Sequence, residues 1–191
     1  QAARAAEAGV KAGVEASAVG VNENDVAAAI HDAQIRAGSE YTALPILVTT
    51  GPRSALAHAT WYRQEIEAGN TVFLEVPGCI NRYHAALMRN VHMGEPPERM
   101  VRATEAIATA LEETIAFMRP GVTAHDAHEV CSRAIAQADL GVTLDHRTAY
   151  SIGVGFAPDW GEGQIISLKE GEHRPLQKGM TFHIVPVVFI P

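Results

Sequence analysis

Residues 69–75, Gly-Asn-Thr-Val-Phe-Leu-Glu, return in altered form at residues 179–185, Gly-Met-Thr-Phe-His-Ile-Val. Each copy joins a glycine to β-branched and aromatic residues, which is typical of a strand that follows a turn. The copies lie 110 positions apart in a chain of 191 residues. A strand that occurs twice at this distance indicates two halves of similar construction.

The segments that precede these two strands repeat as well. Two helices are predicted in each half from Ala-rich stretches with charges at helical spacing. They cover residues 3–18, a segment from a cap at Asn22 or Asn24 to about Arg36, residues 99–118, and residues 123–138 with Thr123 as the cap. The glycine that ends the first helix of each pair, Gly20 or Gly121, is followed by valine in both halves, at an offset of 101.

Between the helix pairs the sequence predicts β structure in the first half. Residues 44–50 are rich in β-formers, and Gly51-Pro52 is a turn. A short strand is expected over Thr71–Val76, followed by a turn at Pro77-Gly78 and an extended stretch over residues 80–92. The second half ends in another β-rich stretch. The two halves therefore predict an α+β domain.

Composition excludes several classes of protein. Hydrophobic residues make up 47% of the chain, and the formal charge of −7 argues against a nucleic-acid partner. No apolar run is long enough to cross a membrane. Cys79 and Cys131 match no metal or redox spacing, so we expect reduced core cysteines in a cytoplasmic protein. The chain starts at Gln1 without methionine and stops at Pro191 directly after an apolar run, so we expect a fragment of a longer polypeptide.

Helix pairs that feed such strands resemble the pita-bread fold of methionine aminopeptidase, aminopeptidase P, prolidase and creatinase. Residues 55–89 resemble a family segment of three parts. It has a histidine, then a strand that begins after Gly-Asp and ends at Asp, and then the motif Tyr-His-x-Asp-x-x-Arg. Residues 179–186 resemble its Gly-Met-x-Phe-x-Ile-Glu-Pro strand. The resemblance implies one catalytic domain over residues 1–191, with pseudo-symmetric helix–helix–sheet halves at about 1–95 and 96–191 around a central site. It also implies an N-terminal domain and final strands outside this chain, and a homodimer.

Most metal ligands of the peptidases in this family are missing here. Four of the family's ligand positions can be read, and they fall on Glu75, Ala86, Tyr150 and Val185. Alanine and valine have no donor atom, whereas a dinuclear site for Mn, Co or Zn needs several carboxylates plus imidazole. We therefore expect no metal ion and no other cofactor.

One segment resembles a particular branch of the family. Residues 150–162, Tyr-Ser-Ile-Gly-Val-Gly-Phe-Ala-Pro-Asp-Trp-Gly-Glu, look like the Gly-Phe-Pro-Pro-Asp-Trp-Gly-Glu motif of the ectoine hydrolases, and residues 179–183 are similar to the same branch. This resemblance implies metal-independent cleavage of a C–N bond in a small cyclic amidine. The expected reaction is the opening of the ectoine ring to N-acetyl-diaminobutyrate.

Glu75 and His58 are the predicted catalytic residues. Glu75 can attack the amidine carbon as a nucleophile or act as a general base on water, and the sequence leaves both roles open. His58 falls where the family keeps a histidine that contacts substrate, and imidazole is the side chain that most often carries protons near neutral pH. The predicted substrate-binding residues are Tyr83, His84, Tyr150, Asp159, Trp160 and His183.

Two other functions stay open at this point. A creatinase-like or Xaa-Pro peptidase-like hydrolase would act on another small substrate, because Glu75 and Trp160 fit any small cation about equally well. A non-catalytic pita-bread domain would bind peptides or proteins and would not need the Glu75 carboxylate for turnover. If the chain opens a cyclic amidine, the expected partner is a small zwitterion such as ectoine.

Overall fold

The computed structural model describes residues 1–142, 144, 146–161 and 165–190. The chain forms two compact units. Unit 1 comprises Gln1–Pro96 and Gly153–Trp160, and unit 2 comprises Pro97–Ile152 and Gly161–Pro191. Within the described ranges, no helix is both long enough and apolar enough to cross a bilayer.

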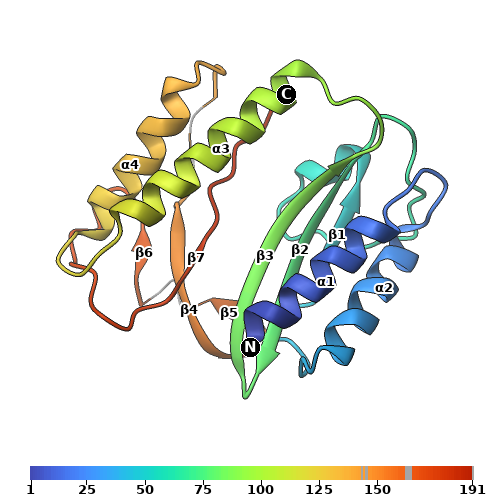
Figure 1. The fold of residues 1–191 in the computed structure, drawn as a ribbon, viewed down its shortest axis with the longest axis horizontal. Helices are drawn as coiled ribbons and strands as arrows, with labels where there is room; N and C mark the ends of the chain where they lie inside the picture. The colour runs from blue at the N-terminus through green and yellow to red at the C-terminus, as the bar shows by residue number, and fades with distance from the viewer. Residues whose placement is uncertain (143, 145, 162–164, 191) are drawn as a thin grey trace. The chain divides into compact units, whose positions relative to one another are not determined.

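Unit 1 begins with two helices, α1 (Ala2–Ala16) and α2 (Glu23–Arg36), which lie on one face of an antiparallel sheet (Figure 1). The sheet order is β1 (Leu47–Thr50), β2 (Thr71–Ile80) and β3 (Tyr83–His92). Alternate residues of a strand point to opposite faces, so one set of apolar side chains lies under the helices. This core includes Val26, Ile30, Ile46, Val48, Ile66, Val72, Leu74 and Val76.

The turn predicted at Pro77-Gly78 is wrong, because β2 continues to Ile80. A Cβ atom on Gly78 would lie 2.2 Å from the carbonyl oxygen of Ala2. The glycine is therefore needed for the close approach of α1 to the strand, and not for a turn. The chain reverses instead at Asn81-Arg82, where both residues have positive φ, as a two-residue hairpin turn requires.

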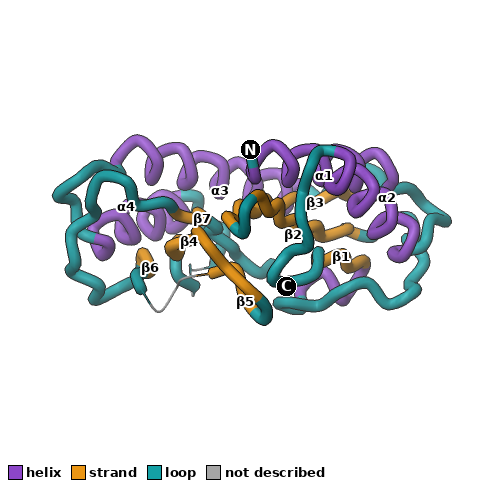
Figure 2. The backbone as a smooth tube through the Cα atoms, turned by 90° about the horizontal axis from the view of Figure 1, so that it is seen from below, coloured by secondary structure: helices purple, strands orange, loops and turns teal. Residues whose placement is uncertain are grey.

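Unit 2 repeats the helix pair with α3 (Glu98–Phe117) and α4 (Ala124–Gln137). The first residues of β4 (Ala149–Phe156) pair antiparallel with β6 (Ser167–Leu168) and β7 (Phe182–Ile184). The last residues of β4 and the short β5 (Asp159–Gly161) belong mostly to unit 1, where Val154 pairs with Tyr83. Figure 2 shows α1 and α3 each on one side of the strands of their own unit.

Both units make the same backbone hydrogen bonds next to the linker of the helix pair. The Gly20 N–H donates to the Ile66 carbonyl at 2.8 Å, and the Gly121 N–H donates to the Leu176 carbonyl at 2.9 Å. A second bond runs back in each unit, from Ile66 and Leu176 to the valine that follows the glycine. These partners lie 101 and 110 positions apart, the offsets seen in the sequence repeat. The duplication itself stays a prediction.

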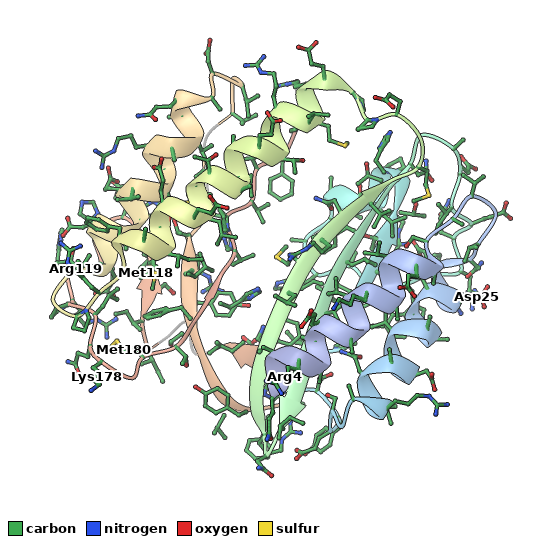
Figure 3. The ribbon with its side chains drawn as sticks, viewed as in Figure 1. Arg4, Asp25, Met118, Arg119, Lys178 and Met180 are labelled. Carbon is green, nitrogen blue, oxygen red and sulfur yellow. The ribbon has the colours of Figure 1, made fainter. Side chains whose placement is uncertain are left out.

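The predicted helix caps are present in both units. The Asn22 side chain accepts a hydrogen bond from the Asn24 N–H at 3.0 Å, and the Thr123 hydroxyl accepts one from the Asp126 N–H at 3.0 Å. Asp25, which matches Asp126 at the offset of 101, lies in the first turn of α2 (Figure 3). A carboxylate at this place interacts favourably with the positive end of the helix dipole.

Candidate active site

Glu75 lies in the middle of β2, on the sheet face away from α1 and α2. Its neighbours Leu74 and Val76 pack into the core under the helices, so its own side chain points the other way. Its cross-strand partners are Leu47 on β1 and Met88 on β3. The residue is 7% exposed, and within the described ranges no hydrogen bond or ion pair reaches its carboxylate.

Burial raises the pKa of Glu75 to about 7. A carboxyl group with a pKa near the working pH can both accept and return a proton, which is what a general acid–base catalyst requires. Thr49 lies on the same face of the sheet, since it pairs with Phe73 two positions before Glu75. Its hydroxyl is buried and has no hydrogen-bond partner among the described residues. The face that carries Glu75 therefore holds buried polar atoms that find no partner in the described part of the chain.

His58 lies in the loop that follows a short 3₁₀ helix (Gly51–Ala55). Its side chain is exposed, and its backbone has a φ of 58°, a left-handed conformation that is uncommon outside glycine. In the described part of the chain, no hydrogen bond joins His58 to Glu75. The catalytic role of His58 stays a prediction.

A buried ion pair fastens the loop that carries His58. The Glu23 carboxylate is fully buried at the start of α2, and Arg53 donates to both of its oxygens at 2.9 and 2.8 Å. The same carboxylate accepts the N–H groups of Thr50, at 2.8 Å, and Tyr62, at 2.6 Å. One side chain thus holds both ends of the segment around His58.

The ion pair of Glu23 and Arg53 was not predicted from the sequence. An acid in the first turn of a helix is typical of a solvated residue near the helix dipole, and an arginine after a turn is usually solvated as well. One signal was available in the comparison of the halves. The residue that matches Glu23 at the offset of 101 is Ala124, so the carboxylate is not required for the helix start itself.

His84 is buried and makes two hydrogen bonds to the main chain. Its Nε2 accepts from the Ala43 N–H at 3.1 Å, and its Nδ1 lies 3.0 Å from the Arg82 carbonyl, to which it donates. These partners assign the proton to Nδ1. Burial lowers the pKa of His84, which keeps the ring neutral. The geometry favours a positioning role, and the predicted contact with substrate stays a prediction.

The other substrate-binding residues predicted in unit 1 differ in exposure. Tyr83 is 42% exposed at the start of β3, and Asp159 is exposed. Trp160 is only 2% exposed, which favours packing over an open wall for a ligand. A Cβ on Gly155 would lie 3.1 Å from the Trp160 Cα atom, so the glycine permits this packing. Glu162, the last residue of the motif, lies outside the described residues.

Tyr150 and His183 are brought together in unit 2. They are cross-strand partners on β4 and β7, and both are buried. The Tyr150 hydroxyl lies 2.8 Å from the His183 Nδ1 atom, and the rings meet edge to face with centroids 5.2 Å apart. Two of the residues predicted to bind substrate therefore form one hydrogen-bonded pair.

The side chains present do not fit a dinuclear metal centre. Ala86 stands opposite Pro77 on β3, and Val185 follows β7, so two of the four ligand positions supply no donor atom. Among the residues that the structure describes, no three His, Cys, Asp or Glu side chains gather in a way that could hold a metal ion. Glu75 supplies the one carboxylate of the four positions.

With this geometry established, sequence comparison identifies the family. The description "Metallopeptidase family M24" matches residues 1–191. The chain belongs to this family. The ectoine hydrolase of Halomonas elongata is 34% identical to this M24 chain over 161 residues, which are 80% of the chain and 38% of the relative. The Xaa-Pro dipeptidase of Pyrococcus horikoshii is 25% identical and matches 97% of the chain and 51% of the relative.

Two solved structures superpose closely on this chain and share its fold. The prolidase of Pyrococcus furiosus superposes with a TM-score of 0.86 at 24% identity, covering 100% of this chain and 55% of that one. The Xaa-Pro dipeptidase of Bacillus anthracis superposes with a TM-score of 0.87 at 22% identity, covering 100% and 52%. The predicted α+β pita-bread fold is thereby confirmed. The M24 chain spans about half the length of the relatives it matches.

Proposed function

We propose that this M24 chain serves the metal-independent hydrolysis of a C–N bond in a small cyclic amidine, with ectoine as the substrate. Glu75 carries the proposal, because it is a buried carboxyl with a pKa of about 7, and the family resemblance puts Ala86 and Val185 at two other carboxylate-ligand positions. The 34% identity to the Halomonas elongata ectoine hydrolase supports the choice of substrate.

The reaction requires a new C–O bond at the amidine carbon. Oxygen from water adds to this carbon, the bond from the carbon to one ring nitrogen breaks, and that nitrogen leaves as an amine after it gains a proton. An amidinium next to Glu75 favours the carboxylate form of this residue, since an opposite charge stabilises the ionised state. Glu75 then either takes a proton from water or bonds to the carbon itself, and water cleaves that adduct. His58 supplies the proton to the leaving nitrogen.

The test follows ectoine by NMR with the full-length protein as wild type, Glu75→Gln and Glu67→Gln. Glu67 is an exposed glutamate of unit 1 and serves as the matched control. The wild type and the control should open the ring at the same rate. Glu75→Gln should lower the rate about a hundredfold to ten-thousandfold, the range for loss of an acid–base group. Equal rates in all three proteins contradict the proposal.

A second measurement separates the two roles of Glu75. Acid quenching during turnover, followed by mass spectrometry of the peptide that contains Glu75, detects an adduct with the mass of the substrate if Glu75 is the nucleophile. Turnover without such an adduct assigns it as the base. If the folded wild type leaves ectoine intact, the creatinase-like, Xaa-Pro peptidase-like and peptide-binding alternatives take precedence. The homodimer and the cytoplasmic location stay predictions.

A further inference from the structure

Three polar side chains of unit 2 meet at the start of β4. The guanidinium carbon of Arg147 lies 4.3 Å from the centre of the Tyr150 ring. The Tyr150 hydroxyl in turn lies 2.8 Å from Nδ1 of His183. Because Tyr150 and His183 face each other in the register of β4 and β7, the sheet fixes the place of this cluster.

The positive charge of Arg147 has no carboxylate opposite it in the parts of the chain that the structure describes. Its Nε atom is buried and finds no acceptor among the residues that the structure describes. Arg147 as a residue is half-buried, but a buried donor without an acceptor costs free energy. A guanidinium held in this state by its stacking on Tyr150 points to an anionic ligand.

The two neighbours of Arg147 supply hydrogen-bonding groups and no negative charge. Burial, followed in size by the charge of Arg147, lowers the pKa of His183 to about 4, so its imidazole is neutral at pH 7. A tyrosine hydroxyl is ordinarily neutral at this pH as well. The cluster as a whole therefore carries one positive charge.

We infer that Arg147, Tyr150 and His183 form a binding site for a carboxylate. The planar guanidinium can donate two parallel hydrogen bonds to a carboxylate, which a lysine ammonium cannot do. One guanidinium matches the single charge of a carboxylate, whereas a phosphate monoester carries nearly two. The ligand is the carboxylate of a zwitterionic substrate, an assignment that rests on the proposed function, or a free small carboxylic acid.

The first experiment tests the site without reference to turnover. Sodium acetate is titrated against sodium chloride at constant ionic strength, while NMR follows the imidazole nitrogens of His183. The wild type and Arg133→Met, a control at an exposed arginine of α4, should show a saturable shift with acetate. Arg147→Met should show none. An absent shift in the wild type, or an equal shift in Arg147→Met, overturns the inference.

A second variant protects this test against loss of folding. Arg147→Lys keeps the charge and loses the planar pair of donors. It should bind acetate more weakly than the wild type does, while thermal unfolding shows an intact fold. Unchanged acetate affinity in Arg147→Lys contradicts the paired hydrogen bonds on which the site depends.

Kinetics then decide the source of the carboxylate. Arg147→Met should raise the KM for ectoine about tenfold to a hundredfold, the effect of losing a hydrogen bond to a charged group. It should leave kcat/KM unchanged for methyl-tetrahydropyrimidine, the ectoine ring without its carboxyl group. Acetate binding without this KM effect assigns the site to a free acid. Acetate binding by a wild type that does not open ectoine refutes the proposed function and supports the carboxylate site.

Discussion

The two units share a frame and differ in where they bury charge. Unit 1 has Glu23 and Glu75 at positions where unit 2, at the offsets of 101 and 110, has Ala124 and Val185. The hydrogen bonds around the helix linkers are nevertheless the same in both units. The frame therefore forms without the carboxylates. In unit 1 they are additions to this frame: Glu23 holds the loop that carries His58, and Glu75 is the proposed reacting group.

Unit 2 has the opposite charge on a half-buried residue, Arg147. Its polar cluster consists of the Arg147 guanidinium, the Tyr150 hydroxyl and the neutral imidazole of His183. Among the residues that the structure describes, Glu75 in unit 1 thus has no cation opposite it, and Arg147 in unit 2 has no carboxylate opposite it.

The largest effect on stability is expected from Arg53→Met in unit 1. This change leaves the Glu23 carboxylate buried without its cation and should lower the free energy of unfolding by about 3 kcal/mol. The matched control is Arg36→Met, which breaks the exposed pair with Asp32 and should cost at most about 0.5 kcal/mol. Urea denaturation of both variants measures the difference.

The rate of ectoine turnover should also fall more in Arg53→Met than in Arg36→Met, because the Glu23–Arg53 pair holds the loop that carries His58 in place. Arg53→Met should lower kcat for ectoine, and Arg53→Lys should recover part of it. Equal stability of Arg53→Met and Arg36→Met would show that the buried pair has no special role in unit 1.

The pH dependence of stability should have opposite signs in the two units. The pKa of Glu75 rises from 4.5 to about 7 on folding, so its contribution to stability is lost as the pH rises across that interval. The pKa of His183 falls from 6.5 to about 4, so its contribution is lost as the pH falls across that interval. Each shift corresponds to about 3 kcal/mol.

Variants separate these two contributions. The stability of Glu75→Gln relative to the wild type should increase as the pH rises from 4.5 to 7. The stability of His183→Gln relative to the wild type should instead decrease as the pH rises from 4 to 6.5. Denaturation curves at a series of pH values measure both, and slopes of the same sign would contradict the burial assigned to one of these residues.

The smallest loss of stability is expected from removing a helix cap, and it should be equal in the two units. Asn22→Ala and Thr123→Ala each remove a side-chain cap from the second helix of a pair and should cost about 1 kcal/mol. Thermal unfolding of the two single variants provides the comparison. A difference of more than about 1 kcal/mol would show that the shared frame is not equally important in both units.

Local signals in the sequence were sufficient for the helices and their caps. Asn22 and Thr123 precede helical patterns, and Gly20 and Gly121 lie in the linkers with positive φ. Short-range interactions therefore fix where these helices begin and end. The strand β2 was predicted too short, because Pro77-Gly78 is also a turn signal. Only the approach of α1 explains the glycine there, and this contact is distant in sequence.

The candidate site was predictable where the family resemblance marks a position, as at Glu75. Its raised pKa follows from burial on a sheet face, which the strand pattern alone does not give. Glu23 and Arg53 lie 30 residues apart and Arg147 contacts Tyr150 across a strand start, so neither arrangement has a local sequence signal. The main-chain partners of His84, Ala43 and Arg82, likewise become visible only in the fold, and its contact with substrate stays a prediction.

Glu75 is proposed to serve ring opening without a metal ion. The most direct measurement is ectoine turnover by NMR after exhaustive dialysis against a chelator, with the metal content determined by mass spectrometry and with Mn²⁺, Co²⁺ or Zn²⁺ added back. We expect the full rate of ectoine turnover at well below one metal ion per chain, and no increase in that rate when any of these metals is added. Loss of turnover on dialysis and its return with one of these metals would contradict this proposal.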